Sequence, residues 1–417
     1  ANAVFRALII YRSDKSDDWR LSLMTAILAP NQKGKVAQTF SNPRRFSFFL
    51  GPNAKINTPQ KFLIKQGSVK DFEDLQKRFS LEVVNKEFYK GISESFTKLV
   101  GGTLGAGKKK KTYESVLQLP SNASKNQNSM EFGVRLIGRI IFCWFLREKK
   151  GQNGIALMPQ ELLSSDAVRQ QSGYYYHGVL EPIFFEVLNK EHRGREEKWV
   201  SEPFSHIPYL NGGLFSPQYE DYYDLDRGIL VSRHINTLVI PDSWFEEFFN
   251  ILESYNFTID ENTSFDEELS IDPEMLGRIF ENLLAEINPE TGESARKSTG
   301  SFYTPRTIVD YMVDESLFLF LKQKTSITDD KLRALISYDL TDDERHALND
   351  SEKQKTIDAL EQLKLLDPAC GSGAFPIGAL QKIVFILQRV DSDAKLWFAK
   401  QIASTAPEIR RVIEREF

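Results

Sequence analysis

The run from Leu363 to Phe375 constrains the fold of this chain more than any other segment. Leu363–Asp367 is short, apolar and ends in an acid, which is typical of a strand buried in a parallel sheet. The loop Pro368–Gly373 carries two glycines, and apolar residues then recur at helical spacing over 375–387. The predicted order is strand, glycine loop, helix, and this order makes a glycine motif informative. We therefore expect an α/β domain here.

The glycine loop suits a ligand that carries both a carboxylate and an amine. Gly371 and Gly373 let the backbone approach a ligand closely, because they lack a Cβ and can adopt positive φ. The amino end of the next helix offers unpaired N–H groups and a partial positive charge, which attract a carboxylate or phosphate. Asp367 can accept a hydrogen bond from an amine. The methionine part of S-adenosylmethionine (AdoMet) combines both groups.

Two common glycine motifs do not fit this loop. Pro376 stands where the dinucleotide fingerprint has its third glycine, and no Gly-Lys-Ser/Thr follows as in a P-loop. The remaining alternative is a tight strand-to-helix turn that binds no ligand.

A second candidate segment, Gly300–Pro305 (GSFYTP), precedes an amphipathic run over 305–322. Thr304 is well placed as an N-cap and Pro305 as the first helical residue. A capped helix accounts for these two residues but not for the aromatic pair Phe302 and Tyr303. An aromatic pair at a helix amino end can cover an apolar or π-rich ligand while backbone amides hold a carboxylate.

The two segments together resemble a known family. Gly300–Pro305 looks like motif X, and Asp367–Phe375 (DPACGSGAF) like motif I, of γ-class adenine-N6 DNA methyltransferases, in which motif X also precedes motif I. The wider sequence is similar to the large methyltransferases of type IIG restriction–modification systems and to the related methylases of BREX-like phage-defence loci. The further stretches that look like this family are FSLEVVNKEF (79–88), RLIGRIIFCWFLREK (135–149), YLNGGLF (209–215) and DPEMLGRIFENLL (272–284).

This resemblance implies an AdoMet-dependent enzyme that methylates the exocyclic amine of adenine in double-stranded DNA, after extruding the base from the duplex. The residues that it assigns to the cofactor are, in motif X, Phe302, Tyr303, Thr304 and Pro305 and, in motif I, Asp367, Pro368, Ala369, Gly371, Ser372, Gly373 and Phe375.

The catalytic motif of that family, Asn/Asp-Pro-Pro-Tyr/Phe, does not occur in the sequence, so no catalytic residue is assigned. The acidic residue that holds the ribose in that family follows the next strand, and no strand is predicted after Val390. We therefore expect a fragment of a larger enzyme, with half of a cofactor site, at most weak AdoMet binding and no methylation by itself.

The whole chain predicts a mixed α+β protein in three parts. Residues 4–65 are predicted as a β-rich N-terminal element, most simply an antiparallel meander. Residues 66–290 read as a mainly α-helical domain, interrupted by a mobile loop over 101–129 that is rich in Gly, Lys, Ser and Asn. Residues 291–417 are expected to begin a Rossmann-like α/β methyltransferase domain. The runs predicted as strands are Val4–Tyr11, Trp19–Leu28 and Phe46–Leu50.

Composition narrows the class of protein. The net charge of −5 gives no overall basic signature, although a local basic groove remains compatible with DNA binding. Cys143 lies in an apolar run and Cys370 in the glycine loop, so a disulfide is not predicted and a reducing cytoplasm fits. No run is apolar enough to span a membrane, and we expect a cytoplasmic protein. The five histidines lack metal-ligand spacing, so no metal site is predicted.

A nuclease remains an open question at this level. Type IIG enzymes often carry a PD-(D/E)xK nuclease, which holds Mg²⁺ between carboxylates, so Mg²⁺ is expected only if the whole protein has such a domain. We interpret the acid–lysine groups at 196–198, at 329–331 and at Glu82 with Lys86 as surface features. The alternatives are a BREX-type methylase without a nuclease, or a non-catalytic DNA-binding or specificity module with an AdoMet-type fold.

Overall fold

The computed structural model divides the chain into two compact units, unit 1 (residues 1–301) and unit 2 (residues 302–417). The described residues are 6–14, 16–26, 28–30, 36–40, 44–105, 110–120, 126–151, 154–171, 173–210, 213–226, 229–232, 234, 236–258, 266–273, 275, 277, 279, 283, 304, 306–338, 347–368, 370 and 373–398.

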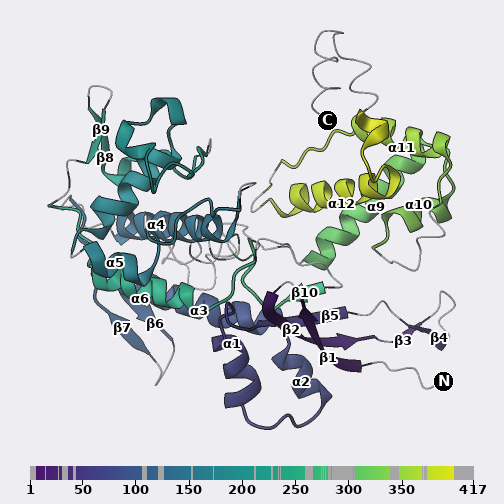
Figure 1. Ribbon diagram of the computed structural model, residues 1–417, viewed down its shortest axis with the longest axis horizontal. Coiled ribbons are helices and arrows are strands. Elements are labelled where there is room, and N and C mark those ends of the chain that lie inside the picture. Colours follow the sequence, from purple (N-terminus) through teal and green to yellow (C-terminus); the bar gives the residue numbers. More distant parts are fainter. Residues whose placement is uncertain are drawn as a thin grey trace. The chain divides into compact units, whose positions relative to one another are not determined.

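Unit 1 contains a four-stranded sheet in the order β1-β2-β5-β10 (Figure 1). The strands β1 (Arg6–Ser13), β2 (Ser16–Thr25) and β5 (Arg44–Leu50) pair in antiparallel fashion, which confirms the meander predicted from the apolar runs. The short acidic strand β10 (Asp266–Glu268) adds in parallel to β5. The sequence of β10 has no apolar alternation that would predict a strand. Its main-chain pairing with β5 is what makes it one.

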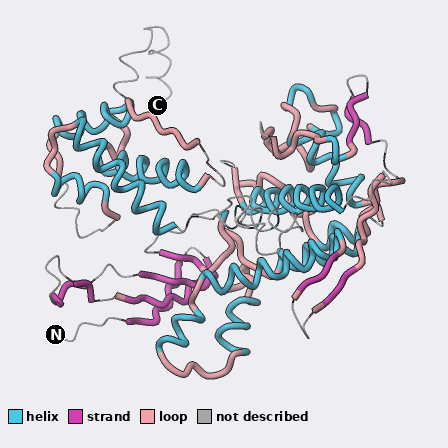
Figure 2. Tube along the Cα trace, turned by 180° about the vertical axis from the view of Figure 1, so that it is seen from behind, coloured by secondary structure: helices cyan, strands magenta, loops and turns pink. Residues whose placement is uncertain are grey.

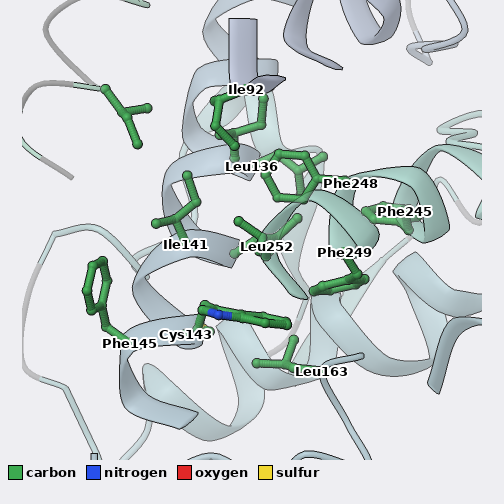
Figure 3. Close-up of a cluster of buried hydrophobic side chains, with 14 of the residues drawn as sticks. Ile92, Leu136, Ile141, Cys143, Phe145, Leu163, Phe245, Phe248, Phe249 and Leu252 are labelled. Carbon is green, nitrogen blue, oxygen red and sulfur yellow. The ribbon is translucent and has the colours of Figure 1, made fainter. Parts of the chain in front are cut away.

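The core of unit 1 forms where three long helices meet. Here α3 (Leu81–Val100) packs on α4 (Asn126–Glu148) and on α6 (Asp242–Glu253). Ile92 from α3, Leu136 from α4 and Phe249 from α6 lie in one buried cluster (Figure 3). These three helices, and α2 (Phe72–Arg78) before them, lie within the segment 66–290 that was predicted as mainly α-helical.

Short elements complete unit 1. The helical ones are α1 (Asn57–Pro59), α5 (Ser165–Gln171), π-helical turns at Gln60–Lys65, Tyr176–Leu180 and Ile183–Leu188, and 3₁₀ turns at His192–Gly194, Glu197–Trp199 and Tyr219–Asp221. The strands are β3 (Leu28–Pro30) with β4 (Val36–Phe40), β6 (Gly102–Leu104) with β7 (Lys111–Tyr113), and β8 (Tyr223–Asp226) with β9 (Ile229–Ser232).

Part of the segment 101–129, which we predicted as a mobile loop, forms regular structure. Strands β6 and β7 pair in antiparallel fashion, and the hydroxyl of Tyr113 donates to Glu94 of α3 over 2.6 Å. Further on, Gln118 and Val239 exchange two main-chain hydrogen bonds of 2.9 Å. A Gly- and Lys-rich sequence has no strand pattern. The structure of this segment therefore depends partly on its contacts with Glu94 and Val239, which lie outside it.

Unit 2 is helical in its described residues (Figure 2). Its helices are α9 (Arg306–Lys324), α10 (Asp329–Ile336), α11 (Asp350–Glu361) and α12 (Ala374–Val390). They pack around a second hydrophobic core, and both α9 and α12 follow the glycine- and proline-containing segments as predicted.

Leu363–Asp367 was predicted as a buried strand, and this was wrong. Its backbone is irregular, and the side chains of Leu365 and Leu366 are 54% and 89% exposed. A parallel strand needs hydrogen-bonded neighbours and cover on both faces. No described residue of unit 2 forms a strand beside this segment, so its apolar sequence has no partner there. The chain is thus a mixed α and β protein, and a Rossmann-like sheet remains a proposal.

Candidate cofactor site

The two predicted cofactor segments lead into two helices that pack against each other. Thr304 lies two residues before α9, and Gly373 immediately precedes α12. The helices touch at Gly378 of α12, where an added Cβ would lie 2.6 Å from Val309 Cγ1 of α9. The side chain of Val309 therefore packs directly against the backbone of Gly378, near the beginning of each helix.

A second contact joins α9 and α12 further along both helices. Lys382 Nζ lies 2.9 Å from Asp314 Oδ1. Lys382 follows Gly378 along α12, and Asp314 follows Val309 along α9. The contact of Val309 with Gly378 lies within the first five residues of both helices, so their amino ends lie near each other.

The amino end of α12 has the backbone geometry of an anion site. Gly373 is the N-cap, with φ 83° and ψ 14°, a left-handed conformation that favours glycine. Its N–H donates to Cys370 O over 2.7 Å, and its carbonyl accepts the first helical hydrogen bond from Ile377 N over 3.0 Å. No side chain of a described residue caps this helix end. Among the described residues, no side chain therefore occupies the first N–H groups of α12, which is the arrangement that an anion site requires.

The amino end of α9 is tied to α12 by Arg306. The guanidinium of Arg306 donates from Nε to Asp310 Oδ1 over 3.1 Å and from Nη2 to the side-chain oxygen of Gln381. The first residue of α9 thus reaches across to α12, which connects the end that follows motif X to the helix that follows motif I.

The structure describes some of the predicted cofactor residues. Thr304, Asp367 and Gly373 are half-buried, and Pro368 is exposed. Phe375 is partly buried and packs on the hydrophobic core of unit 2, so its observed role is to anchor α12. The predicted residues that lie outside the described part are Phe302, Tyr303, Pro305, Ala369, Gly371 and Ser372.

An ion pair between the buried Lys382 and the half-buried Asp314, close to these helix ends, was not predicted from the sequence. The side chain of Lys382 is 1% exposed, and its ammonium donates to Ile336 O over 2.9 Å as well as meeting Asp314. Burial lowers the pKa of Lys382 and raises the pKa of Asp314. The feature of the sequence that could have indicated this pair was a lysine among the apolar residues of α12. Lys382 contacts α9 through Asp314 and α10 through Ile336 O, so it connects three helices of unit 2.

The acid–lysine groups that were considered as nuclease candidates at 196–198 and 329–331 lie on the surface. Lys198 pairs with Glu196 at 3.2 Å through exposed side chains, and Asp329 begins α10, in agreement with our interpretation of both as surface features. Among the described residues, no group of His, Cys, Asp and Glu side chains could hold a metal ion. Both cysteines are free, as predicted: Cys143 is buried, which raises its pKa, and Cys370 is exposed. None of the described helices combines the length and apolarity needed to cross a membrane.

Comparison with known proteins gives a relative in Methanocaldococcus jannaschii. This chain is 29% identical over 336 residues to a protein with the provisional name type II restriction enzyme and methyltransferase. The match covers 74% of this chain and 26% of that protein, so the chain spans about a quarter of the relative's length. No protein-family model matches the chain, and no solved structure matches it. The similarity relates the chain to a protein named for both restriction and methyl transfer.

Proposed function

We propose that this chain forms half of the cofactor site of an AdoMet-dependent DNA adenine-N6 methyltransferase, of the type IIG restriction–modification kind. The observation that carries this proposal is the contact of α9 with α12 at Val309 and Gly378. It lies within the first five residues of both helices, so it brings the helix ends at GSFYTP and DPACGSGAF near each other. The name of the relative favours a restriction–modification enzyme over a methylase without a nuclease.

The described residues fit the methionine part of AdoMet. The uncapped amino end of α12 would bind the carboxylate through N–H groups and helix dipole. Asp367 would accept a hydrogen bond from the ammonium group, and Thr304 would lie beside the cofactor at the start of α9. In this proposal Phe302 and Tyr303 would cover the cofactor. When bound, AdoMet supplies an activated methyl group for transfer to the adenine amine of double-stranded DNA.

The proposal also accounts for an apolar surface on unit 2. Ile377, Leu380 and Val384 form an exposed stripe along α12, and Leu365 and Leu366 are exposed just before it. In a complete Rossmann-like domain, helices of this kind cover a parallel sheet. The strands that would cover this surface, and the catalytic Asn-Pro-Pro-Tyr-like motif, would belong to a longer polypeptide, and this chain spans about a quarter of the relative's length.

A change at Gly373 tests the cofactor proposal. Gly373→Asp would place a carboxylate against that of AdoMet, so we expect the thermal stabilisation by AdoMet to disappear. An added Cβ at Gly373 meets only Ile377 Cγ1, at 3.9 Å. The left-handed φ of 83° strains any side chain, but Asp and Asn adopt this conformation more readily than other residues, so the fold should persist.

Gly373→Asn is the matched control, because Asn has the shape of Asp, tolerates left-handed φ and carries no charge. We expect Gly373→Asn to keep most of the AdoMet-induced shift in melting temperature. Equal shifts in the Asp and Asn variants would refute a carboxylate site at this helix end.

A further inference from the structure

We propose that Gly378 is a positioning residue that sets the distance between the two halves of the cofactor site. The inference rests on the proposed function, because it concerns the same site. Gly378 is not part of either motif segment and lies on the buried face of α12, five residues after Gly373.

The contact at Gly378 leaves no room for a side chain. A Cβ there would lie 2.6 Å from Val309 Cγ1 and 3.7 Å from Val313 Cγ2. Val309 is 1% exposed, and a valine in a helix has one strongly preferred χ1 rotamer, so its methyl group cannot turn away. Since carbon atoms pack at about 3.5–4.0 Å, an added methyl group would move α9 and α12 apart by about 1 Å.

This contact acts on both motif segments. Val309 lies five residues after Thr304, and Gly378 lies five residues after Gly373, so each helix end is about 7–8 Å from the contact. Helices transmit such a displacement as rigid bodies. A ligand held by both ends would lose its fit to one of them when the helices separate.

Two polar contacts keep the helices from sliding instead. Arg306 of α9 bonds to Gln381 of α12, and Lys382 of α12 pairs with Asp314 of α9. These contacts lie on either side of Val309 along α9, and both lie after Gly378 along α12. They hold the two helices together, and the absent side chain at Gly378 sets the distance between them.

The test measures the dissociation constant of AdoMet for the 417-residue chain by ligand-observed NMR, which resolves weak binding. Gly378→Ala should weaken binding by at least about tenfold, since a misplacement of about 1 Å has large effects on a fitted site. The double variant Gly378→Ala/Val309→Ala removes the methyl groups that clash. It should return the dissociation constant to within about threefold of the wild-type value, a rescue that a general loss of stability would not produce.

Gly133→Ala is the matched control for overpacking. Gly133 lies on α4 of unit 1, where an added Cβ would meet Val100 Cγ1 at 2.8 Å. This variant should lower the melting temperature and leave the AdoMet dissociation constant unchanged.

The possible outcomes separate this inference from the proposed function. If AdoMet binding is lost in Gly373→Asp but unchanged in Gly378→Ala, the positioning role is overturned and the cofactor proposal stands. A loss in Gly378→Ala that the double variant does not restore also overturns the positioning role. If the wild-type chain shows no AdoMet binding, the cofactor proposal fails, and the role of Gly378 fails with it.

Discussion

His177 makes the stability of unit 1 depend on pH. Its Nε2 lies 2.8 Å from Leu238 O, and its Nδ1 lies 3.0 Å from Glu181 Oε2, so both ring nitrogens face acceptors. Burial lowers the pKa of His177, but the hydrogen bonds to Glu181 and to Leu238 O outweigh it, and the pKa is raised. The doubly protonated ring is therefore the form that the fold favours.

We expect the free energy of unfolding of unit 1 to decrease as pH rises above about 6.5, the ordinary pKa of histidine. A raised folded-state pKa gives stabilisation that is complete below the unfolded value and is lost as pH passes the folded value. Urea unfolding, followed by the fluorescence of the buried Trp144 and Trp244, measures this decrease. The glutamine in His177→Gln does not titrate, so this variant should show a smaller decrease in the free energy of unfolding as pH rises.

His192→Gln is the control for this measurement, because His192 is exposed and its pKa is lowered by burial and by Arg195. That variant should retain the decrease in stability above pH 6.5. A His177→Gln variant with the full wild-type pH dependence would show that the contact with Glu181 does not hold a proton.

At the scale of elements, α6 contributes the aromatic side chains that hold unit 1 together. Phe245, Phe248 and Phe249 are fully buried, and Phe249 stacks on Trp144 with ring centroids 5.7 Å apart. Phe249→Ala should lower the free energy of unfolding by about 3–5 kcal/mol, because it leaves a cavity in a packed core. Asn250→Ala, at an exposed position of the same helix, should change it by less than about 0.5 kcal/mol. A loss of under about 1 kcal/mol for Phe249→Ala would contradict the packing of α6.

The helices could be predicted from the sequence because the pattern that defines each helix lies within it. Strands that depend on a distant partner could not. The acidic strand β10 exists through its pairing with β5, and the hairpin of β6 and β7 has no apolar alternation. Conversely, Leu363–Asp367 has the composition of a strand but no neighbouring strand among the described residues of unit 2.

In the candidate site, too, local backbone features could be predicted and contacts between helices could not. The glycine loop predicts a left-handed residue before a helix, and Gly373 has that conformation. The contact between Gly378 and Val309 could not be predicted, because a glycine within a helical pattern does not indicate which residue packs against it. The ion pair between Lys382 and Asp314 was missed for the same reason.

At the scale of the whole molecule, the two units have separate hydrophobic cores, and the motif I segment and the pair α9 and α12 belong to unit 2. The boundary between residues 301 and 302 falls inside Gly300–Pro305. Thr304, the described residue of this segment, therefore belongs to unit 2 together with α9 and α12. Cofactor binding should thus depend on the packing of unit 2 rather than on the core of unit 1.

We expect the 417-residue chain to bind AdoMet weakly and to transfer no methyl group to DNA. The sequence contains no Asn/Asp-Pro-Pro-Tyr/Phe motif, so the residues that would hold the adenine amine near the methyl group are missing from the chain. Incorporation of tritiated methyl groups from AdoMet into double-stranded DNA measures this, with an active adenine methyltransferase as the positive control. Incorporation above the blank that Gly373→Asp abolishes would show that this chain contains its own catalytic centre. Incorporation that Gly373→Asp leaves unchanged would not come from the proposed cofactor site, and a mock preparation without the chain would separate a contaminating enzyme from a site elsewhere in the chain.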